Sequence, residues 1–218
     1  MRGNTQAMMN LASIYYENDS LKSIQQSLSW YKKAAKFGDG DAYDRIGYFY
    51  TLGEGVEKND SLAFENFKKA AELKSANGAL NLGVQYMLGC GTIKDLKESE
   101  KWYIKAAEYG NAEAAWRLYA MYTNGDSFPK NEIKAEEFLQ KAVKAKHPEA
   151  CYHIGARYYW GKSVEKNYQQ AFIYWKLAAD QGHLDACKNV AYCYKNGEGC
   201  TKDLKKAEEY KNKAKGKG

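Results

Sequence analysis

A two-residue motif, Lys followed by Asn or Asp, recurs along this chain at a fixed interval of 36 residues. The Asn and Asp residues of this motif are Asn59, Asp95, Asn131, Asn167 and Asp203. A Tyr lies nine residues before each of them, at Tyr50, Tyr86, Tyr122, Tyr158 and Tyr194. A fixed period of this length is typical of stacked supersecondary units. It predicts one continuous repeat array, although 218 residues could also form one or two globular domains.

Six units can be aligned on a small residue near the start of each. These residues are Ala7, Ala42, Gly78, Ala114, Ala150 and Ala186. Apolar residues recur four and eight positions later, as in Ala150, Ile154 and Tyr158, which is one face of a helix. The fifth position after the start is Gly or Ala in five units, and Tyr119 is the exception. Because Gly inside a helix costs about 1 kcal/mol relative to Ala, its recurrence predicts a closely packed neighbouring helix.

Each unit continues with a loop and a second helical segment. Three loops share a Gly-x-Gly core, whose first Gly is expected to end the preceding helix in a left-handed conformation. The recurring Asn or Asp is expected to cap the second helix, with Glu98 and Gln170 placed to complete capping boxes. Gly110 and its equivalents are expected to end that helix, and Lys74 and Lys146 replace this Gly in two units. The residues therefore predict an all-α chain of helix–loop–helix units.

The third unit resembles the Sel1-like repeat, a relative of the tetratricopeptide repeat. The matching residues are Leu82, Gly83, Tyr86, Gly89, Gly91, Asp95, Trp102, Tyr103, Lys105, Ala106, Ala107 and Gly110. The resemblance extends in register over nearly the whole chain. It implies a right-handed α/α superhelix, or solenoid, forming a single domain over residues 1–218. The expected repeats are approximately residues 4–38, 39–74, 75–110, 111–146, 147–182 and 183–218.

The resemblance also implies a non-enzymatic adaptor or scaffold that binds a protein or peptide on its concave face. One branch of the family is secreted and carries a disulfide in each repeat. Its first Cys position is occupied here by Ala71, Ala107, Val143 and Ala179, so this branch is not supported. Cys151 and Cys187 do occupy the other half of that pair.

The composition adds expectations about compartment and charge. The odd number of Cys, five, and the lack of a Cys-x-x-Cys motif favour reduced thiols in a cytoplasmic setting. No signal peptide is visible and no apolar run is long enough to span a membrane. Gly3-Asn4 matches the boundary between later repeats, which suggests a fragment of a longer protein. The net charge of +6 is concentrated in residues 202–218, interpreted as a solvated last helix rather than a tail for nucleic acid or membrane.

The sequence contains no motif that supports a catalytic activity. The chain has three His, none in a zinc-protease pattern, and it contains neither a nucleophile elbow nor a Walker loop. Cys151 and His153 lie two residues apart on one helix and therefore face different directions. We accordingly expect no cofactor, no metal site and no small-molecule substrate.

A binding surface is better supported. The side of the first helix opposite the apolar stripe is expected to line the concave face. The candidate residues there are Arg45, Tyr48, Leu80, Met87, Trp116, Arg117, Tyr152, His153, Tyr159 and Trp160. Aromatic residues and Arg are typical of interaction hot spots. Three alternatives remain. Leu80, Trp116, Tyr152 and Trp160 could pack between adjacent first helices instead of facing a partner. The repeats could bind RNA, or the chain could be the repeat domain of a larger signalling or host-interaction protein.

Overall fold

The computed structural model describes residues 2–18 and 20–216. Met1, Asp19, Lys217 and Gly218 lie outside the described residues. They include both ends of the expected domain, one residue of the first inter-helix linker (Asp19) and the last lysine of the basic segment (Lys217). Gly3 and Asn4, expected at a repeat boundary, lie inside the first helix instead.

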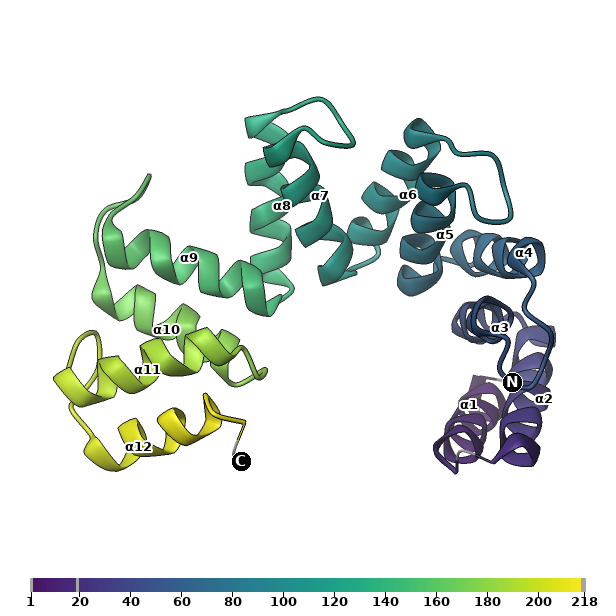
Figure 1. Cartoon of the computed structure of the whole chain (residues 1–218), viewed down its shortest axis with the longest axis horizontal. Helices are drawn as coiled ribbons and strands as arrows, with labels where there is room; N and C mark the ends of the chain where they lie inside the picture. Colours follow the sequence, from purple (N-terminus) through teal and green to yellow (C-terminus); the bar gives the residue numbers. More distant parts are fainter. Residues whose placement is uncertain (1, 19, 217–218) are drawn as a thin grey trace. The chain divides into compact units, whose positions relative to one another are not determined.

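The described residues form twelve helices and no strand (Figure 1). The helices are α1 Arg2–Glu17, α2 Leu21–Lys36, α3 Gly40–Leu52, α4 Asp60–Glu72, α5 Ala76–Leu88, α6 Leu96–Glu108, α7 Ala112–Asn124, α8 Glu132–Lys144, α9 Pro148–Trp160, α10 Tyr168–Ala179, α11 Leu184–Asn196 and α12 Leu204–Lys213. Two helices fall in each expected repeat, which confirms the all-α fold of helix–loop–helix units. None of the described helices is long and apolar enough to cross a membrane.

The helices group into two compact units. The first comprises Met1–Ala114 with Asn124–Lys130, and the second comprises Ala115–Thr123 with Asn131–Gly218. In the first unit, α1 packs on α2, α3 on α4 and α5 on α6, and successive pairs stack through α2 on α3 and α4 on α5. The second unit repeats this scheme, since α9 packs on α10, α11 on α12 and α10 on α11.

One backbone hydrogen bond explains the constant spacing between the recurring Tyr and the Asn or Asp. The amide of Asp95 donates to the Tyr86 carbonyl at 2.9 Å, and the same bond closes the loops at Asn59, Asn131, Asn167 and Asp203. Each of these Asn or Asp side chains also caps the second helix, as predicted. The capping boxes expected at Glu98 and Gln170 are not formed. The cap amide that such a side chain would satisfy already donates to the Tyr carbonyl.

The helix ends follow the predicted backbone conformations. Gly53, Gly89, Gly161 and Gly197 end their helices in the left-handed region, with φ between 68° and 77°. After the second helices, Gly110 has φ of 94°, whereas Lys74 and Lys146 adopt φ of 62° and 59° at the equivalent positions. A side chain in this region costs about 1–2 kcal/mol, so these two lysines are strained sites.

The glycine inside α3, α5 and α9 lies against an aromatic ring from the second helix of the same repeat. A Cβ added to Gly155 would stand 2.5 Å from the Trp175 ring, and one added to Gly47 would stand 2.6 Å from Phe67. This confirms the predicted close approach of the helices. In the fourth repeat Tyr119 takes the small position, and the buried Leu139 takes the position of Phe67 and Trp175. The aromatic residue of this pair therefore lies on the first helix in the fourth repeat and on the second helix in the others cited.

Candidate partner-binding surface

The candidate residues lie on the first helix of a repeat, and we call the side of these helices that carries them the first-helix face. In the first unit this face is formed by α3 and α5. Arg45 is exposed and Tyr48 is 40% exposed, with its ring edge-on to Phe67. The Tyr48 hydroxyl donates to Asn81 Oδ1 at 3.5 Å, which ties the ring to the next first helix. Leu80 and Met87 are half-buried.

A buried polar link between α3 and α5 lies beside Tyr48. Asn81 Nδ2 donates to Asp44 Oδ1 at 2.7 Å, and Asp44 is only 2% exposed. Burial raises the pKa of Asp44 to about 6, and the hydrogen bond from Asn81 opposes this rise only in part. Asp44 therefore contributes to the contact between two successive repeats rather than to a solvent-exposed surface.

In the second unit Trp116 of α7 is half-buried among other rings. It stacks on His147 with centroids 5.5 Å apart and lies 5.5 Å from His153. Partial burial of its ring lowers the pKa of His153, and the positive charge of Arg157 lowers it further. Arg117, next to Trp116, is exposed. The structure thus brings the candidates Trp116 and His153 together.

Tyr152 of α9 stacks on His183, the capping residue of α11, with centroids 4.5 Å apart. Trp116 has the equivalent contact with His147, the residue before α9. Both aromatic residues therefore stack on the histidine that precedes the first helix of the next repeat. Each retains partial exposure.

Tyr159 and Trp160 close the C-terminal end of α9 and form an aromatic cluster, which we define as Tyr159, Trp160, Tyr168 and Tyr192 with Glu198. Trp160 is 74% exposed, so the alternative in which it is buried is wrong. Its ring stands edge-on to Tyr159 at 4.9 Å, and Tyr159 packs on Trp175 and Tyr168. Trp160 therefore projects from a base of packed rings.

Glu198 supplies the acidic group of this cluster. The Tyr159 hydroxyl donates to Glu198 Oε2 at 3.0 Å, and the Tyr192 hydroxyl donates to Oε1 at 3.3 Å. Burial, together with the hydrogen bond to Glu198, raises the pKa of Tyr159. The cluster thus contains an exposed indole ring and an oriented carboxylate, each in contact with Tyr159, which suits an apolar or a cationic side chain.

Glu198 was missed in the sequence, although a signal for it exists. In the first unit the Tyr16 hydroxyl donates to Glu54 Oε2 at 2.8 Å. In both pairs the Glu is the middle residue of a Gly-Glu-Gly loop, and the Tyr lies near the end of the preceding first helix. A comparison of residues between successive repeats would have found both pairs.

The three buried thiols lack the low pKa of catalytic nucleophiles. Burial raises the pKa of Cys193 to about 12 and also raises the pKa values of Cys151 and Cys187. Reactive cysteines need the opposite shift. All five cysteines are unpaired, and no group of three or more metal-ligating side chains occurs among residues 2–18 and 20–216.

Comparison with known proteins identifies the repeat. The Sel1 repeat model matches residues 5–39, 40–75, 76–111, 112–147, 148–183 and 184–217. A search of curated proteins by sequence found no match.

Solved structures with the same repeat are also similar. The Sel1 repeat protein from Oxalobacter formigenes is 26% identical, with a TM-score of 0.80. The protective antigen c5321 of uropathogenic Escherichia coli is 28% identical, with a TM-score of 0.70. The comparison covers 99% of this chain in both cases, but 62% and 46% of those two chains. This chain therefore spans less than two thirds of their length.

Proposed function

The chain belongs to the Sel1 repeat family, whose members are generally helical-repeat scaffolds for protein interaction, and from this premise we propose that it binds a protein or peptide on its first-helix face. The interaction is non-covalent recognition on a preformed surface. Trp160 is the main anchor, Arg45 and Tyr48 offer contacts in the first unit, and His153 and Tyr159 offer contacts in the second.

The exposure of Trp160 is the observation that carries this proposal. An indole that is 74% exposed contributes little to folding, yet it is among the side chains that contribute most to protein interfaces. Tyr159 supports its ring from one edge, so little conformational entropy is lost when a partner packs on it. Glu198 is held in place by the hydroxyls of Tyr159 and Tyr192 and can accept a hydrogen bond from a partner's Lys or Arg.

The test compares two truncations of exposed side chains in the second unit. Trp160→Ala removes the proposed anchor, whereas Ile133→Ala removes an 85% exposed side chain from α8, a second helix. Each purified variant is immobilised and exposed to native lysate, and retained proteins are identified by mass spectrometry. We expect a protein that the unmodified chain and Ile133→Ala retain and that Trp160→Ala loses. Affinity for that protein, once purified, should fall about 30-fold or more in Trp160→Ala.

Thermal unfolding provides the control for folding. Both variants should keep the midpoint of the unmodified chain to within a few degrees, because neither truncated side chain is buried. Equal retention of every protein by the two variants would refute the proposal for Trp160. A large fall in the midpoint of Trp160→Ala would show that its ring is structural instead.

A further inference from the structure

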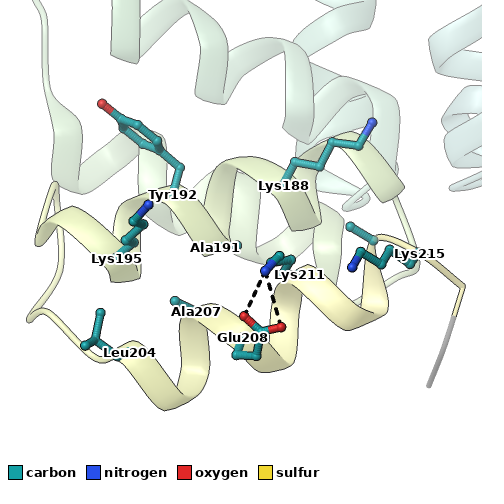
Figure 2. A pocket seen from close by; sticks show the side chains of 10 residues that line it. Lys188, Ala191, Tyr192, Lys195, Leu204, Ala207, Glu208, Lys211 and Lys215 are labelled. Atoms are coloured by element: carbon teal, nitrogen blue, oxygen red, sulfur yellow. Dashed lines mark hydrogen bonds and ion pairs between the residues drawn. The ribbon is translucent and has the colours of Figure 1, made fainter.

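A groove of about 560 Å³ runs between α11 and α12 (Figure 2). Ala191, Ala207 and Ala214 lie along it, and Leu204, 63% exposed, stands near one end. Lys188 and Lys195 line it from α11, and Lys211 and Lys215 line it from α12 and the turn that follows. The groove therefore combines small apolar residues with a cationic rim.

The corresponding groove one repeat earlier is occupied by a helix. The face formed by α9 and α10 receives α11, whose Cys187 and Val190 are buried in a cluster with Ala171, Trp175 and Ala178. Ala207 and Ala214 stand 36 residues after Ala171 and Ala178. The small residues that allow a helix to approach closely are thus retained in the groove between α11 and α12.

The large residues have changed in a consistent way. Trp175, Tyr152 and Tyr159 line the earlier groove, and 36 residues later the chain has Lys211, Lys188 and Lys195. Glu208 forms an ion pair with Lys211 at 3.1 Å, and Asp185 forms one with Lys188 at 2.7 Å. Four lysines and one glutamate line the groove, so its lining carries a net positive charge.

We propose that the groove between α11 and α12 binds an acidic amphipathic helix of a partner protein. Small or aliphatic residues on one stripe of this helix fill the position that Cys187 and Val190 fill in the earlier groove. Asp or Glu residues on both flanks of the stripe pair with Lys188, Lys195 and Lys211. The Tyr159–Glu198 hydrogen bond gives a precedent, because Lys195 is the repeat equivalent of Tyr159 and would donate to a partner carboxylate instead. The groove shares Tyr192 with the aromatic cluster, whereas Trp160 does not line it.

The experiment is a selection from a displayed helix library. Library members have Ala, Val or Leu on a fixed stripe and a free choice of Glu, Lys, Gln or Ser at the flanking positions. The intact chain is the target, and its charge-reversed form Lys188→Glu/Lys195→Glu/Lys211→Glu is the counter-target. The matched control is Lys68→Glu/Lys97→Glu/Lys144→Glu, the same charge change on exposed residues of α4, α6 and α8. Circular dichroism establishes that each variant is folded.

We expect the selected helices to carry Glu at the flanks and to bind the control variant as tightly as the unmodified chain. Affinity for the charge-reversed groove should fall about tenfold or more at low salt, and helices with Lys at the flanks should regain it. The affinity of the acidic helices should also fall as salt concentration rises. Failure to enrich acidic helices, or equal binding to the charge-reversed form, would overturn the proposal.

Two other occupants are tested in the same series. Self-association of the unmodified chain in sedimentation experiments, abolished by the groove lysine substitutions, would assign the groove to a second copy. Tighter binding of a fluorescent single-stranded RNA through the same lysines would assign it to nucleic acid. Either result would overturn the proposal of an acidic helix. Loss of binding in Trp160→Ala alone bears on the proposed anchor and not on the groove, because Trp160 does not line the groove.

Discussion

Replacing Gly155 by Ala tests how closely the two helices of one repeat are packed. The new Cβ would lie 2.5 Å from Cδ1 and 2.7 Å from Nε1 of Trp175. Ordinary contacts between carbon atoms are about 3.5–4.0 Å long, so the ring or the helix must move by about 1 Å. Trp175 cannot move freely, because its Nε1 donates to the Tyr152 carbonyl at 3.2 Å and its ring packs on Tyr159.

The expected loss of stability follows from three terms. Overpacking of a core of this kind costs about 1–3 kcal/mol. A weakened Trp175 hydrogen bond adds about 1 kcal/mol, and the better helix propensity of Ala returns about 1 kcal/mol. We therefore expect Gly155→Ala to lower the free energy of unfolding by about 2 kcal/mol.

Gly83→Ala is the matched control in α5. There the new Cβ would meet Tyr103 at 3.3 Å, a distance that a shift of a few tenths of an ångström relieves. The cost of that shift and the gain in helix propensity should nearly cancel, so the free energy of unfolding should change by less than about 0.5 kcal/mol.

Urea unfolding followed by circular dichroism and by tryptophan fluorescence measures both variants. Coincident transitions establish that a single free energy describes the change, which is not assured in repeat proteins. Trp175→Phe in the Gly155→Ala background provides a double-mutant cycle, and the smaller ring should relieve about 1 kcal/mol of the loss. Equal effects of Gly155→Ala and Gly83→Ala, or no coupling between Gly155 and Trp175, would refute the packing argument.

Four further substitutions address buried or strained sites. The pKa of Asp44 is higher in the folded chain (about 6) than in the unfolded chain, so folding is favoured at low pH. Stability should therefore fall as pH rises from about 4 to about 6. Asp44→Asn should remove this fall and raise the free energy of unfolding by about 2–3 kcal/mol at pH 7. A variant with an unchanged pH profile in urea unfolding would contradict this role of Asp44. Lys74→Gly and Lys146→Gly should each raise the free energy of unfolding by about 0.5–1 kcal/mol, because Gly adopts positive φ without strain. This gain should appear as a higher midpoint of thermal unfolding. A lower midpoint would show that contacts of the lysine side chains outweigh the backbone strain. Gln85→Met should raise the free energy of unfolding, measured in urea, by about 1 kcal/mol, because Gln85 Oε1 is buried without a hydrogen-bond partner. A lower free energy of unfolding would indicate that a water molecule hydrogen-bonds to the Gln85 amide.

Features within one repeat could be predicted from the sequence. The positions of the helices, the Asn and Asp caps and the left-handed glycines each follow from a local rule about backbone conformation. The close approach at Gly47 and Gly155 was also predictable, since a recurring Gly inside a helix needs a packing reason. These features depend on residues that are close in sequence or that repeat with a constant period.

Contacts between successive repeats could not be predicted in the same way. The helical period assigned no role to Asp44, but Asp44 binds Asn81, which lies 37 residues further along the chain. Trp116 and Tyr152 were assigned to an outward surface, and each also stacks on a histidine of the next repeat. The side chain that covers such a position belongs to another helix, so the periodicity of a single helix does not contain the information.

The hydrogen bond that closes each loop also makes the chain suitable for measuring local unfolding by hydrogen exchange. The amides of Asn59, Asp95, Asn131, Asn167 and Asp203 each donate to a carbonyl near the end of the preceding first helix. Each amide can exchange only when the connection between the two helices of its own repeat opens. The five exchange rates would therefore give the opening free energy of the second to the sixth repeat one by one, and would show at which repeat the array begins to unfold.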